Sequence, residues 1–139
     1  MWYDSRMNDE ETELDQSDLI ELAFFEALMV RMPQDAEILK AVADIYTRVG
    51  RYEDGLVVDQ RLSSLCGDDP MVWYNLACSQ ALLRMSLPAM ESLKRAVELG
   101  YDDAEWMKKD EDLRSLREER GFKTLLNKLT GVTEPEPDH

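Results

Sequence analysis

Hydrophobic residues recur at helical spacing along most of the chain, and turn residues divide them into segments. Between residues 36 and 49 the apolar positions are Ile38, Leu39, Val42, Ile45, Tyr46 and Val49, which is the spacing of one helix face. Gly50 then fits the end of a helix, and residues 52–65 repeat the helical spacing until Gly67 and Pro70 close it. The pattern predicts a helical hairpin over residues 36–69, and residues 70–99 read as a second pair of antiparallel helices.

A separate helix is predicted before the hairpins, over residues 17–32, with Ser17 as its cap and Pro33 after its end. Its apolar residues are Leu19, Ile20, Leu22, Ala23, Phe24, Phe25, Ala27, Leu28, Met29, Val30 and Met32. A helix that is apolar nearly all round must be covered on more than one side. We expect one side to pack on the next helix. For the other side we rank packing within the chain first, against the Trp2–Tyr3 segment, and a self-association face next; a ligand is the remaining alternative.

Composition and charge narrow the class of protein. A length of 139 residues suits one domain that needs neither disulfides nor a metal to fold. The net charge of −14 disfavours binding to nucleic acid and favours basic partners. Residues 1–16 hold six acids and one base, and residues 132–139 hold three acids. Such acidic ends are typical of solvated, flexible tails.

The chain lacks the residues that several classes of function require. No apolar run is long enough to span a membrane, and no signal peptide is recognised, so we expect a cytoplasmic protein with Cys66 and Cys78 reduced. The single histidine is His139, and no phosphate-binding loop or nucleophile motif occurs. The acidic run 110–112 is interpreted as a helix start or a solvated face. We therefore expect no enzyme, cofactor or metal site.

The two hairpins repeat with a period of 34 residues. Leu39, Val42 and Ala43 align with Trp73, Leu76 and Ala77, and Gly55 aligns with Ala89. Hairpins with this period cannot bury their faces alone and must stack. The sequence resembles the tetratricopeptide repeat, because its Trp, Leu, small, Ala, aromatic and Ala positions match Trp73, Leu76, Ala77, Ala89, Leu93 and Ala96. The first hairpin departs from that pattern at Asp59 and Leu62, and the second at Gln80.

The resemblance implies an all-α fold, a short α-solenoid of antiparallel helical hairpins wound as a right-handed superhelix. Residues 17–32 resemble the second half of a preceding repeat. A third repeat fails after Asp102, and residues 104–131 resemble the degenerate helical cap of bacterial repeat proteins. The expected organisation is an acidic N-terminal tail over 1–16, a repeat domain over 17–131 with repeats 36–69 and 70–103, and an acidic C-terminal tail over 132–139.

The resemblance also implies a concave groove lined by the first helix of each repeat. The candidate partner-binding residues at those positions are Lys40, Asp44, Met71, Tyr74, Asn75, Cys78 and Leu82. An apolar groove of this kind suits an amphipathic helix or an extended segment. The alternative is that the same residues pack on the cap or on a tail. A clamp for chaperone C-termini is rejected, because Asp44 and Glu105 stand where the family has an amide and a base.

Three functions stay open. The leading hypothesis is a protein-interaction adaptor that binds a peptide or protein segment, basic or amphipathic, in the groove. The second is a small acidic chaperone for an exported or aggregation-prone client. The third is a homo-oligomer, a homodimer for example, that associates through the helix at 17–32.

Overall fold

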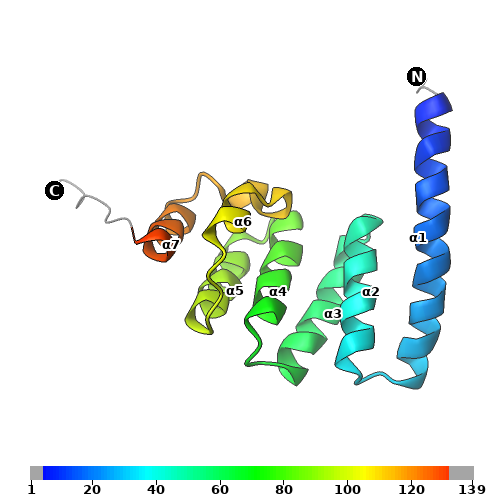
Figure 1. The fold of residues 1–139 in the computed structure, drawn as a ribbon, viewed down its shortest axis with the longest axis horizontal. Coiled ribbons are helices and arrows are strands. Elements are labelled where there is room, and N and C mark those ends of the chain that lie inside the picture. The colour runs from blue at the N-terminus through cyan, green and yellow to red at the C-terminus, as the bar shows by residue number, and fades with distance from the viewer. Residues whose placement is uncertain (1–4, 132–139) are drawn as a thin grey trace. The chain divides into compact units, whose positions relative to one another are not determined.

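The computed structural model describes the backbone of residues 5–131 and the side chains of residues 16–131, and every regular element in that range is a helix (Figure 1). The chain forms two compact units, Met1–Leu65 and Cys66–His139. The all-α prediction is confirmed. The sequence analysis treated residues 17–131 as one domain, whereas the structure divides them close to the predicted boundary between the two repeats. Residues 1–4 and 132–139, part of the two predicted tails, lie outside the described range.

The first unit contains three helices, α1 (Ser5–Arg31), α2 (Ala36–Arg48) and α3 (Tyr52–Leu65). Both α1 and α3 pack against α2. The helix α1 begins at Ser5 and not at Ser17, so residues 5–16, predicted as part of a flexible tail, are helical. Those residues include neither glycine nor proline and are rich in glutamate, a good helix former. The acidic charge of residues 5–16 therefore does not distinguish a helix from a flexible tail.

The second unit contains α4 (Pro70–Leu82), α5 (Ser86–Glu98), α6 (Ala104–Lys109), the 3₁₀ helix η1 (Glu111–Leu116) and α7 (Arg120–Thr130). α4 pairs with α5, η1 packs on α4, and α7 lies against α5 and α6. The best-buried large side chains of its core include Tyr74, Leu93, Met107, Leu113, Leu116 and Phe122. The core thus joins the second hairpin to the segment predicted as a cap.

Helix starts recur every 34 residues. Asp35, Asp69 and Asp103 are the N-caps of α2, α4 and α6. Each carboxylate accepts a hydrogen bond from a backbone N–H two or three residues further on, at 3.0, 2.9 and 3.0 Å. An aspartate at this position satisfies backbone donors that have no partner inside the helix. The period therefore extends into the third, degenerate segment, where α6 is only one and a half turns long.

The turns of the two hairpins follow the same period. The Arg51 N–H donates to the Tyr46 carbonyl at 2.8 Å, and the Met85 N–H donates to the Gln80 carbonyl at 2.9 Å. Gly50 and Arg84 hold the equivalent left-handed position, with φ of 82° and 62°. Glycine adopts that conformation at little cost, whereas arginine does not.

Small residues sit where the paired helices approach closely. A Cβ added to Gly55 would lie 3.5 Å from the Tyr46 Cβ, so α2 and α3 are nearly in backbone contact there. In the second unit Ala77, Ala89 and Ala96 are fully buried, as the sequence predicted. Larger side chains at these positions would push the helices of each hairpin apart. Among the described residues, none of the helices combines the length and hydrophobicity of a membrane crossing.

Candidate protein-binding surfaces

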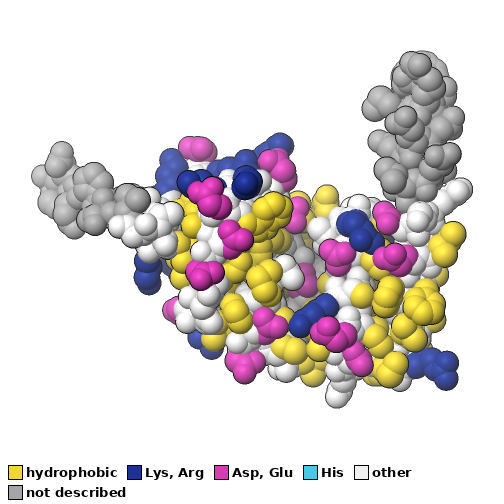
Figure 2. Space-filling view, viewed as in Figure 1, with side chains coloured by type: hydrophobic (Ala, Val, Ile, Leu, Met, Phe, Trp, Pro, Cys, Tyr) yellow, Lys and Arg dark blue, Asp and Glu magenta, His cyan; other side chains and the backbone are white. Residues whose placement is uncertain are grey.

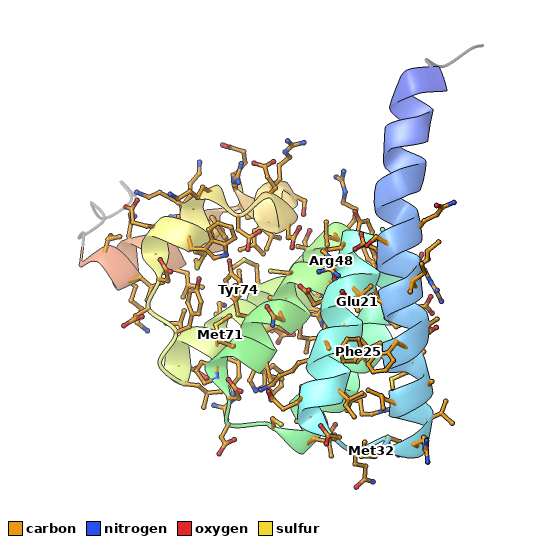
Figure 3. All side chains as sticks on the ribbon, turned by 45° about the vertical axis from the view of Figure 1, so that its right-hand side comes forward. Glu21, Phe25, Met32, Arg48, Met71 and Tyr74 are labelled. Carbon is orange, nitrogen blue, oxygen red and sulfur yellow. The ribbon has the colours of Figure 1, made fainter. Side chains whose placement is uncertain are left out.

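The middle of the predicted groove on α4 is closed. Tyr74 is only 2% exposed, and its hydroxyl donates a hydrogen bond to Oδ2 of Asp110 at 2.7 Å. Its ring stacks on Tyr101, with centroids 4.4 Å apart and an interplanar angle of 8°. Cys78 is buried beside it. The prediction that Tyr74 and Cys78 face a partner is therefore wrong, and the alternative of packing on the cap holds for both (Figure 3).

Asp110 is the residue that closes this part of the groove. Its Oδ2 accepts from the Tyr74 hydroxyl and, at 3.7 Å, from the Cys78 thiol. Its Oδ1 accepts from the Asp112 backbone N–H at 3.0 Å and caps η1. The Arg117 guanidinium donates to its carbonyl at 3.0 Å. The sequence predicted a helix start here but not the burial of Asp110, because a run of acids is typical of a solvated face.

Burial sets the protonation states around Asp110. Burial, followed by the nearby Cys78 and Asp110, raises the pKa of Tyr74 far above its ordinary value, so its hydroxyl stays a donor. Burial also raises the pKa of Tyr101 to about 12. The pKa of Asp112 is raised as well, first by burial and then by Asp110 and its own neighbour in the chain, Glu111.

Cys78, Asp110 and Asp112 bring three potential metal ligands within 4.8 Å of one another. Both carboxylate oxygens of Asp110 already accept hydrogen bonds from protein donors. These bonds hold η1 on α4 and account for the burial of the aspartate. The cluster is thus explained as a structural cap, and it gives no reason to propose a metal.

The ends of the predicted groove on α4 remain accessible. Met71 is 46% exposed, and Asn75 lies exposed one helical turn further on. Leu82, the last residue of α4, is half-buried and lines a cleft of about 390 Å³ beside η1. The buried Tyr74 and Cys78 lie between these positions in the chain, so α4 offers two separate patches and no continuous stripe.

Lys40 and Asp44 belong to α2 in the first unit, and each forms an ion pair within that helix. Lys40 contacts Glu37 at 3.5 Å, and Asp44 contacts Arg48 at 3.2 Å. Exposed pairs at this spacing contribute little to stability. Both side chains stay at the surface, but an incoming charged group would have to compete with the partner that each already has.

Arg48 ties α1 to α2. Besides Asp44, its guanidinium contacts Glu21 at 3.0 Å and Asp18 at 3.5 Å, both on α1 (Figure 3). The hydrogen bond to Glu21 is the main cause that raises the pKa of Arg48. The Tyr46 hydroxyl of α2 donates to the Glu26 carboxylate of α1. These polar contacts fix which side of α1 faces α2.

The opposite side of α1 is apolar and open. Leu22 is buried and Phe25 is half-buried toward α2 (Figure 3). The exposed large hydrophobic residues here are Leu19 (47%), Ile20 (73%), Phe24 (60%), Val30 (80%) and Met32 (46%), which follows the end of the helix. Figure 2 shows hydrophobic side chains over the described part of α1. Packing against the Trp2–Tyr3 segment was the first expectation for this side, and that segment lies outside the described range. Among the described residues nothing covers it.

Most positions of the same face are polar on α3. Arg31 and Leu65 end α1 and α3 with a spacing of 34 residues, so positions in the two helices correspond. At matching positions α1 has Leu19, Ile20, Ala27 and Val30, where α3 has Glu53, Asp54, Arg61 and Ser64. The counterpart of Ala23 is Val57, which is 56% exposed, and the counterpart of Phe24 is the buried Val58. A solvent-facing side of a helix is expected to be polar, and the apolar face of α1 is more extensive than that of α3.

Comparison with known proteins adds a partial likeness. No protein-family model matches the chain. Over 90 residues it is 29% identical to a chloroplastic protein of Arabidopsis thaliana, and the match covers 60% of this chain and 26% of that protein. The chain thus spans about a quarter of the length of this curated relative. The name of the relative gives its compartment and states neither a partner nor an activity.

Proposed function

We propose that this chain is a helical-repeat module of the tetratricopeptide type, a short α-solenoid that binds another polypeptide. The repeated aspartate caps, the matching turn bonds and the buried alanines of the second hairpin support a repeat of 34 residues. Solenoid repeats bind partners on extended surfaces. The outer face of α1 is apolar, whereas the solvent-facing side of a helix is expected to be polar.

The observation that carries the proposal is the open apolar face of α1. Five large hydrophobic side chains are between 46% and 80% exposed along its last turns and the residue that follows. An apolar patch of this kind on a soluble protein is typical of a protein-interaction site. The corresponding side of α3 is mostly polar, with Val57 as an exposed apolar residue, so the extent of the apolar patch is a feature of α1.

The shape of this face suits a helix. Ala23 and Ala27 are both exposed and lie one turn apart, with larger apolar residues on either side. Small residues let a second helix approach closely, and the larger ones then pack into its grooves. The proposed partner is therefore an amphipathic helix that lays its apolar side on α1. The accessible ends of the predicted groove, Met71 and Asn75 among them, form a second candidate contact.

Site-specific photo-crosslinking tests this assignment. Phe24 is replaced by the photoreactive aromatic residue benzoylphenylalanine, which preserves an aromatic ring at an exposed position. The matched control places the same residue at Leu87, which is 80% exposed on α5 and has no comparable apolar surroundings. We expect an adduct with a second polypeptide from position 24 and none from position 87.

The mass of the adduct separates the candidate functions. An adduct with one defined partner supports the adaptor, and loss of that partner after Ile20→Glu places the contact on α1. An adduct of twice the chain's mass, together with a dimer in light scattering, shows instead that the partner helix is a second copy and favours the homo-oligomer. If positions 24 and 87 give the same result, the proposal is wrong.

A further inference from the structure

A cleft of about 450 Å³ lies in the second unit, between α5 and α7. Its walls carry three cationic side chains, Lys94 of α5 and Arg120 and Lys128 of α7, and its apolar lining includes Val97 and Leu125. Arg120 and Lys128 are two turns apart on one side of α7 and are exposed, as is Lys94. The cleft therefore combines a positive rim with an apolar floor.

The three cations have no ion pair with any residue that the structure describes. By contrast, Lys123 on the same helix pairs with Glu118 at 3.2 Å. The acid in the cleft, Glu98, pairs with Arg95 at 3.4 Å. In a chain with a net charge of −14, three uncompensated cations around one hollow form a local positive site.

We propose that this cleft binds an acidic polypeptide segment that carries an apolar side chain. Carboxylates of the segment would meet the three cations, and the apolar side chain would cover Val97 and Leu125. A nucleic acid fits less well, because the apolar floor gives a phosphate backbone no contact. The site is independent of the α1 face, since it lies in the other unit and shares no residue with it.

Fluorescence anisotropy with the full-length protein tests the proposal. The probe is a labelled short peptide of alternating glutamate and leucine, with a glutamate–serine peptide of the same charge as its comparison. We expect the glutamate–leucine peptide to bind more tightly, and to weaken as salt is added. Substitution of all three cations (Lys94→Gln, Arg120→Gln, Lys128→Gln) should weaken binding by roughly tenfold or more.

A matched control variant loses the same number of positive charges as the cleft variant but keeps the three cations of the cleft. It carries Lys108→Gln, Lys109→Gln and Lys123→Gln, three exposed cations of the same unit that do not line the cleft. It should bind like the unmodified protein. Equal losses in both variants would overturn the proposal, because overall charge would then explain the binding. So would equal affinity for the two peptides, or tighter binding of a labelled oligothymidine.

The chain's own residues 132–139 include Glu134, Glu136 and Asp138 and are an acidic segment in sequence. A full-length variant with Glu134→Gln, Glu136→Gln and Asp138→Asn therefore serves as a further arm. Tighter peptide binding by this variant, lost again when the cleft cations are removed, supports an acidic-segment site. Tighter binding that survives removal of those cations places the peptide elsewhere and overturns it.

Discussion

Replacing Asp110 by alanine should free η1 from α4. The substitution removes the N-cap of η1, which costs about 1 kcal/mol. It also leaves the hydroxyl of Tyr74, a residue only 2% exposed, without its acceptor at 2.7 Å, and an unpaired buried hydroxyl costs about 1–3 kcal/mol. Because the two losses share one side chain they will not add fully, and we expect about 2–3 kcal/mol in total.

Thiol labelling of Cys78 reads out this opening directly. Cys78 is buried under η1, so a reagent reaches it only when that contact opens. In a Cys66→Ser background, Asp110→Ala should raise the labelling rate roughly 30- to 140-fold, the factor that corresponds to 2–3 kcal/mol. Tyr74→Phe removes the hydroxyl together with its need for an acceptor, and should therefore cost only about 1 kcal/mol.

Asp103→Ala is the matched control. Asp103 caps α6 as Asp110 caps η1, but its side chain is exposed and holds no buried hydroxyl. It should leave Cys78 labelling nearly unchanged. A rise of less than about threefold for Asp110→Ala, which is under 0.7 kcal/mol, would refute the reasoning. The contact of η1 with α4 would then not depend on Asp110.

Three further predictions concern the repeat and its charges. Ala89→Leu should overpack the fully buried crossing of α4 and α5 and cost about 1–3 kcal/mol in urea unfolding, whereas Leu87→Ala at an 80% exposed site should have little effect. Both Gly50 and Arg84 have positive φ, so Arg84→Gly should stabilise the chain and Gly50→Ala should destabilise it by about 1 kcal/mol. If both substitutions shift the melting temperature in the same direction, the two turns are not equivalent. Burial, followed by two neighbouring acids, raises the pKa of Asp112 above its ordinary value of 3.8. The protonated carboxyl is therefore favoured in the folded state, and it stabilises the fold fully below pH 3.8. This stabilisation is lost as the pH rises through the pKa of the folded state. Asp112→Asn should accordingly raise the melting temperature at neutral pH, and this gain should disappear below pH 3.8.

The helices and their period could be predicted because they depend on local rules. Helical spacing of apolar residues predicted both hairpins, and small residues at 77, 89 and 96 predicted where α4 and α5 approach. The start of α1 could not be found in the same way. Residues 5–16 are charged and lack an apolar stripe, so no periodic pattern in the sequence marks where the helix begins.

The candidate site depended on long-range contacts, and there the sequence misled. Tyr74 and Cys78 occupy positions that a repeat helix would present to a partner, yet Asp110, more than thirty residues later, covers both. The signal was available in part, since Asp35, Asp69 and Asp103 share a 34-residue spacing that Asp110 does not follow. Asp110 also caps a helix, η1, but its second carboxylate oxygen accepts from Tyr74, and no local pattern predicts that contact.

The two units differ in whether their apolar surface is covered. It is buried in the core of the second unit and exposed on the outer side of α1 in the first. In the second unit the segment after α5 folds back, so that η1 packs on α4 and α7 packs on α5. In the first unit no described element covers the outer side of α1, although Arg48 and Tyr46 hold the helix in one orientation. Polar contacts that fix a helix while its apolar face stays open cost ordering entropy and leave hydrophobic surface in water. Both costs are offset if a partner helix packs on the apolar face of α1, and crosslinking at Phe24 is designed to detect that contact.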